Sequence, residues 1–105
     1  MAIGDSYLTS IRQYVRVSST AHDSELTDLI NAARADLVRV GVLEEKAQDE
    51  TDPLIKRAVA TYVKAEFGLD NEDSEKYRAS YKELRNALSL ADDYIAQEEP
   101  EPEEG

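Results

Sequence analysis

The spacing of apolar residues constrains this chain most strongly, because they recur with a period near 3.6 almost everywhere up to residue 95. No stretch shows the strict apolar and polar alternation of a half-buried strand. The pattern therefore predicts an all-α fold. A chain of 105 residues and 11.7 kDa has room for one compact domain, which we place at residues 1–95.

Turn and capping residues divide the pattern into four expected helices. They begin near residues 5, 21, 53 and 74 and end before residue 18 and near residues 40, 67 and 95. Gly41 is expected to end the second helix in a left-handed conformation. Asp52 is expected to cap the third helix, with Pro53 at its first position. Residues 42–51, charged and without periodicity, are expected to form a long exposed loop, and such loops are often functional.

The last expected helix has two apolar faces. One is a heptad stripe made by Tyr77, Tyr81, Leu84, Leu88, Ala91 and Ile95, and the second line consists of Ala87, Leu90 and Tyr94. A four-helix unit of this size would not be expected to cover both. The sequence therefore predicts that partner molecules complete the burial of this helix.

The charge is strongly negative, with 12 basic and 23 acidic residues and a net charge of -11. Five of the acids lie in residues 96–105, which also hold two prolines and no large apolar residue, so we expect a disordered acidic tail. The remaining acidic excess disfavours nonspecific binding to nucleic acid. No apolar run is long enough to span a membrane, and the N-terminus lacks the features of a signal peptide, so a cytosolic origin is expected.

The residues needed for catalysis or for binding a cofactor are missing. There is no cysteine, and the single histidine, His22, stands among polar residues without a nucleophile motif. The acidic run 70–75 lacks the glycine and the final bidentate acid of a calcium loop. We therefore expect a protein that is not an enzyme, with no catalytic residue, metal or cofactor.

Several aromatic and basic residues are candidates for contacts between copies. Tyr7, Tyr14 and Tyr94 fit the inner stripes poorly, and arginines occur on different helices opposite an excess of acid. These arginines could form weak surface ion pairs, or basic and acidic faces of neighbouring copies could meet head to tail in a closed ring. The candidates for the subunit interface are Tyr7, Arg12, Tyr14, Arg16, Arg34 and Arg39.

Two stretches carry a resemblance to a known family. The residues from Glu25 to Arg34 read Glu-Leu-x-x-Leu-Ile-x-Ala-Ala-Arg, and those from Asp52 to Val59 read Asp-Pro-Leu-Ile-Lys-x-Ala-Val. In this order and separation, over about residues 5–95, they resemble the small helical head-tail connector proteins of long-tailed bacteriophages. The resemblance implies a virion adaptor, present in the host cytoplasm before assembly, with about a dozen copies in a ring beneath the portal protein.

The resemblance also implies roles for two segments. The C-terminal segment would grip the portal, here through Leu90, Tyr94 and Ile95, because the acidic tail suits this contact poorly. The segment between the second and third helices would reach the channel or the next head-completion or tail protein, and its candidates are Glu44, Glu45, Lys46, Asp49 and Glu50. DNA would pass through without specific binding, repelled by an acidic wall. The net charge leaves one alternative open, a small acidic DNA mimic that blocks a nucleic-acid-binding protein.

Overall fold

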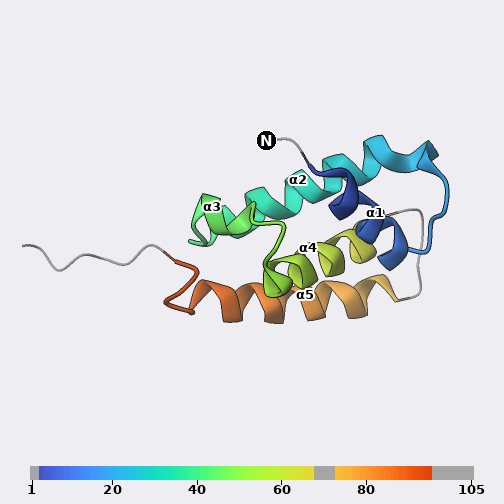
Figure 1. The fold of residues 1–105 in the computed structure, drawn as a ribbon. Helices are drawn as coiled ribbons and strands as arrows, with labels where there is room; N and C mark the ends of the chain where they lie inside the picture. The colour runs from blue at the N-terminus through green and yellow to red at the C-terminus, as the bar shows by residue number, and fades with distance from the viewer. Residues whose placement is uncertain (1–2, 68–72, 96–105) are drawn as a thin grey trace, which may run out of the picture.

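The computed structural model describes residues 3–67 and 73–95, which form an all-helical domain (Figure 1). The four long helices are α1 (Asp5–Tyr14), α2 (Asp23–Arg39), α4 (Pro53–Glu66) and α5 (Ser74–Ser89). A 3-10 turn, η1 (Thr20–His22), precedes α2, and a one-turn helix, α3 (Glu44–Ala47), follows it. The predicted all-α class is confirmed. The predicted acidic tail, residues 96–105, lies outside the described residues.

The central helix is α4, which packs against both α2 and α5, while α1 contacts α2 and α4 (Figure 1). Its inner positions carry small or β-branched side chains, which let both neighbouring helices approach closely. The expected inner stripes of α2 and α4 supply most of the interior. The largest fully buried side chains are Ile11, Leu26, Ile30, Leu37, Val42, Ile55, Val59 and Val63.

The ends of α2 and α4 have the predicted local chemistry. Asp52 Oδ1 accepts hydrogen bonds from the backbone N–H groups of Leu54 at 2.9 Å and Ile55 at 3.2 Å, and Pro53 occupies the first helical position. Gly41 follows α2 with φ of 111°. Its N–H donates to Val38 O, and that of Val42 donates to Leu37 O, which forms a Schellman turn.

The prediction that the last helix reaches Ile95 is wrong, because α5 ends at Ser89. The chain then turns back, the N–H of Leu43 donates to Tyr94 O at 2.8 Å, and Ile95 forms an isolated antiparallel bridge with Val42. Continuing the helix would place Asp92 and Asp93 at the negative end of its dipole, and the last turn of α5 has no basic residue to compensate.

The prediction of a long exposed loop at residues 42–51 is also wrong. Val42 is 2% exposed and Ala47 is fully buried, because α3 packs against α2. A helix of one turn has too few residues to show an apolar period, so the charged residues of α3 resembled a loop. The segment is therefore a folded part of the domain.

Candidate interaction surfaces

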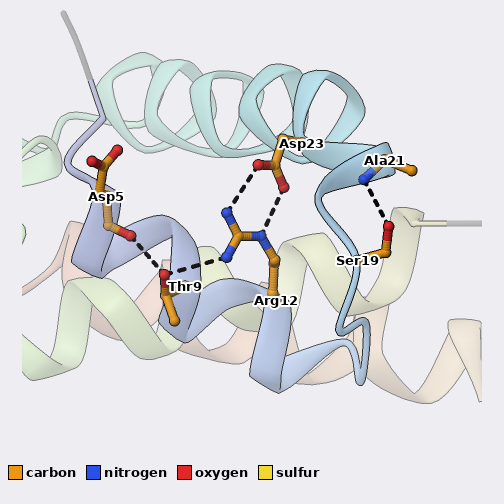
Figure 2. A network of polar contacts seen from close by, with 6 residues as sticks. All are labelled: Asp5, Thr9, Arg12, Ser19, Ala21 and Asp23. Atoms are coloured by element: carbon orange, nitrogen blue, oxygen red, sulfur yellow. Dashed lines mark hydrogen bonds and ion pairs between the residues drawn. The ribbon is translucent and has the colours of Figure 1, made fainter.

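Arg12 links the end of α1 to the start of α2 through an ion pair (Figure 2). Its Nε and Nη2 donate to the two carboxylate oxygens of Asp23 at 2.8 and 2.9 Å, and its Nη1 donates to Thr9 Oγ1 at 3.3 Å. The hydrogen bond from Arg12 holds the pKa of Asp23 below its usual value. Two parallel bonds give this pair a fixed geometry. Arg12 is thus already engaged within the chain, although it was predicted to contact a neighbour.

Tyr7 and Arg34, which were predicted at the subunit interface, are both buried within the chain in this structure. Tyr7 is 4% exposed and Arg34 is 5% exposed. The guanidinium lies over the Tyr7 ring, 5.4 Å from its centroid, and its Nη2 donates to Glu50 Oε2 at 3.2 Å. Burial raises the pKa of Tyr7 to about 12. The stacked ring and the carboxylate explain why an arginine tolerates this position.

Asp36 accepts hydrogen bonds from three side chains, two on α5 and one on its own helix α2. Tyr81 Oη donates to its Oδ2 at 2.7 Å, Arg85 Nη1 donates to the same oxygen at 3.0 Å, and Arg39 Nη2 donates to Oδ1 at 2.7 Å. Burial works against ionisation of Asp36, but these hydrogen bonds outweigh it and hold the pKa of the carboxyl below its usual value. The side chain of Arg39 remains 68% exposed. It is therefore still accessible to a partner.

Tyr14 and Arg16, the other predicted interface residues, lie at the exposed end of α1. Tyr14 is 42% exposed. Arg16 has φ of 61°, in the left-handed region that favours glycine. The N–H groups of Arg16 and Val17 donate to Gln13 O and Arg12 O, so α1 ends in a second Schellman turn with arginine at the glycine position.

The predicted channel-facing residues have different surroundings. Glu44 and Glu45 are exposed on α3, and Lys46 Nζ lies over the Tyr94 ring, 5.8 Å from its centroid. Asp49 accepts hydrogen bonds from Thr51 Oγ1 and Thr51 N, which hold its pKa below the usual value. Glu50 accepts the N–H of Gly4 at 3.0 Å in addition to its bond with Arg34, so it stabilises the fold.

Two exposed leucines lie at the end of the domain where α5 finishes. Leu90 is 79% exposed, and Leu54, in the first turn of α4, is 50% exposed. Both belong to the same end because α4 and α5 run antiparallel (Figure 1). We call Leu54 and Leu90 the end patch. Sequence reasoning missed Leu54, although its place beside rather than on the inner stripe of α4 could have indicated it.

Tyr94 and Ile95, the other two residues predicted to dock on the portal, are only partly accessible. Tyr94 packs against the core, and its hydroxyl donates to Asp52 Oδ1 at 3.2 Å. Ile95 pairs with Val42. Of the three residues predicted to dock on the portal, Leu90 alone is therefore fully available in this conformation.

Within residues 3–67 and 73–95, no helix is both long and apolar enough to cross a membrane. Over the same ranges, no three His, Asp or Glu side chains gather as ligands of a metal ion would.

Comparison of the sequence with known protein families identifies the family of this chain. The family model described as phage connector protein matches residues 7–95, which is most of the chain and includes nearly all of the described helices. The chain belongs to the phage connector protein family. This confirms the resemblance to head-tail connectors that the two sequence stretches indicated. No curated protein and no solved structure matches the connector.

Membership of this family gives the connector a structural rather than a catalytic role, as an adaptor and component of the phage virion. The matched region begins in α1 at Tyr7 and ends at Ile95, the residue that bridges to Val42. The end patch therefore lies inside the part of the connector that the family defines.

Proposed function

We propose that the connector docks on the portal protein through the end patch and assembles there into a ring of about a dozen copies. The observation that carries this proposal is the 79% exposure of Leu90. A leucine left in water at the end of a helix gains about 1.5 to 3 kcal/mol when a partner buries it. The ring would extend the DNA channel and present a platform for the next head-completion or tail protein.

The charge distribution supports a conduit that does not bind DNA. Glu44 and Glu45 are exposed on α3 and would face the channel or the next ring, and the net charge of -11 repels phosphates. The side chain of Arg39 and the exposed Tyr14 would contribute to contacts between copies. Each copy would remain a monomer in the host cytoplasm until the portal template is present.

Four of the 23 acids are already engaged and so unavailable for the alternative role of a DNA mimic. A mimic needs rows of free acids that imitate two phosphate strands. Asp23, Asp36, Glu50 and Glu66 instead form ion pairs with arginines of the same chain. These acids stabilise the fold and are not free to bind a basic partner.

The docking proposal is tested with Leu90→Asp and its matched control Ala79→Asp, an exposed residue in the first half of α5. Both variants add one negative charge, and neither position is buried, so both should fold. Cosedimentation with portal rings of the same phage should lose binding at least tenfold with Leu90→Asp and stay within about twofold with Ala79→Asp. Equal binding of the two variants contradicts docking through the end patch.

Assembly is tested by analytical ultracentrifugation of the connector alone and after addition of portal rings. The proposal expects a monomer alone at micromolar concentration and ring-sized complexes only with portal. A stable ring without portal would contradict assembly on a template.

A further inference from the structure

Seven of the twelve cations form no ion pair among the described residues: Lys46 on α3, Lys76 and Lys82 on α5, and four that lie on α4 or just after α1. Arg12, Arg34, Arg39, Arg78 and Arg85 each form an ion pair. Arg16, Lys56, Arg57 and Lys64 have no carboxylate partner in the part of the chain that the structure describes. We call these four residues together with Tyr14 the basic face.

Two hollows place three of these cations, Arg16, Lys56 and Lys64, around Tyr14. One is lined by Tyr14, Arg16, Lys64, Phe67 and Tyr77 together with Val15 and Asp73, and the other by Tyr14, Lys56, Ser10 and Gln13. Tyr14 lines both hollows, so it links the cations of α1 to those of α4. Asp73 is the single carboxylate among these lining residues.

The cations of α4 are arranged along its length. Arg57 and Lys64 are seven residues apart, which puts them on the same side of the helix. Lys56 and Lys64 lie over the rings of Tyr7 and Tyr77, with Nζ 5.7 and 4.8 Å from the centroids. Aromatic rings hold the ammonium groups in place without neutralising them. The ammonium groups of Lys56 and Lys64 therefore stay positively charged and can attract an acidic ligand.

The chain carries an acidic segment long enough to reach this face. Residues 96–105 contain five glutamates and no basic residue. They follow Ile95, which is fixed to Val42, beside Tyr94, whose hydroxyl binds the cap of α4. Ten extended residues span up to about 33 Å, whereas the 14 residues of α4 extend about 21 Å.

We propose that residues 96–105 dock on the basic face of their own chain through glutamate contacts with Arg16, Lys56, Arg57 and Lys64. Each exposed pair contributes only about 0 to 1 kcal/mol, but the tether gives the segment a millimolar effective concentration. The contact covers the basic face in the isolated chain, and an acidic partner would have to displace it. This inference does not depend on ring formation or on portal docking.

The test uses the full chain with Gly105→Cys, which is the single cysteine available for a nitroxide spin label because the sequence has none. In ¹⁵N spectra, the label should strongly broaden the amide signals of Tyr14, Arg57 and Lys64 at low salt. The broadening should disappear at about 500 mM salt, which screens exposed charges. It should also disappear when the five tail glutamates are changed to glutamine.

Matched variants and a mixing experiment complete the test. Arg57→Gln with Lys64→Gln should abolish the broadening at Tyr14, whereas Lys76→Gln with Lys82→Gln, which removes two cations from α5, should leave it. Spin-labelled chain without ¹⁵N, mixed with unlabelled ¹⁵N chain, should broaden nothing. Broadening in the mixture means docking between copies and overturns the proposal, as does broadening that survives the glutamate changes or never appears.

Discussion

Tyr81 Oη donates a 2.7 Å hydrogen bond to Asp36 Oδ2, which connects α5 to α2 across α4. Tyr81 is 5% exposed, and its ring meets the Tyr62 ring edge to face with centroids 5.1 Å apart. Arg85 donates to the same carboxylate oxygen. The two outer helices therefore depend on one carboxylate of α2 for their polar contact.

Removal of the Tyr81 hydroxyl tests this contact. Tyr81→Phe keeps the ring packing and loses a hydrogen bond to a charged group, so the free energy of unfolding should fall by about 1.5 to 3 kcal/mol. Tyr14→Phe removes a hydroxyl from an exposed ring and should change it by less than about 0.5 kcal/mol. Urea unfolding followed by circular dichroism measures both. Equal losses in the two variants would contradict a special role for Tyr81.

The lowered pKa of Asp36 predicts a specific acid dependence. Because the folded state holds this pKa below that of the unfolded chain, the ionised carboxylate stabilises the fold above about pH 4. That contribution is lost as the pH falls through the folded-state pKa. Asp36→Asn should therefore be less stable at neutral pH and lose less stability than the wild type between about pH 4 and pH 2. Parallel unfolding free energies over this range would exclude the effect.

Glu50 neutralises the buried Arg34 and also binds Gly4 N. Arg34 already has two buried nitrogens, Nε and Nη1, without a hydrogen-bond partner among the described residues. Glu50→Ala leaves an uncompensated buried charge and should cost about 3 kcal/mol or more. Combining it with Arg34→Met should recover part of the loss. A double variant that is less stable than Glu50→Ala alone would contradict this explanation.

The two Schellman turns predict opposite effects of glycine. Arg16→Gly removes left-handed strain and should raise the free energy of unfolding by about 0.5 to 1 kcal/mol. Gly41→Ala introduces such strain at φ of 111° and should lower it by about 1 kcal/mol or more, although no atom lies close enough to clash. Thermal unfolding measures both. A destabilised Arg16→Gly variant would show that this side chain contributes more to the fold than its backbone strain costs.

Asp52 has two tasks that can be separated by mutation. Asp52→Ala removes the cap of α4 and should cost about 0.5 to 2 kcal/mol. Tyr94→Phe removes only the hydroxyl that Asp52 accepts, and its cost should be smaller because this bond of 3.2 Å is long. Hydrogen exchange should show faster opening of the first turn of α4 in Asp52→Ala alone. Similar exchange in both variants would contradict separate tasks.

The sequence predicted those parts of the fold whose cause is local. Asp52 and Pro53 start a helix through neighbouring atoms, and Gly41 ends one through its own backbone freedom. The inner stripes of α2 and α4 were also predictable, because burial follows helical spacing. These features require no knowledge of distant contacts.

The remaining features depend on contacts between distant residues. Ala91 and Ile95 extend the apolar period of α5, but a period indicates which residues are buried and not whether the backbone remains helical. The pairing with Val42 and Leu43 decides that, and it is not encoded near residue 90. Arg34 was expected at the surface because the ring of Tyr7 and the carboxylate of Glu50 come from other elements.

The candidate surfaces were predictable to a similar degree. The exposure of Leu90 followed from its place on the second apolar line. That Leu54 lies at the same end of the domain could not be predicted, because it depends on the packing of α4 against α5. The roles of Leu90, Tyr94 and Ile95 on the portal and of Glu44 and Glu45 at the channel stay predictions.

The bridge between Val42 and Ile95 joins positions far apart in the chain, with α3, α4 and α5 between them. Closing so long a loop is entropically slow, and a ribosome must synthesise all of α5 before the bridge can form. The bridge is therefore the last contact of the domain in the order of synthesis, because α2 and α4 are both complete before Ile95 is added.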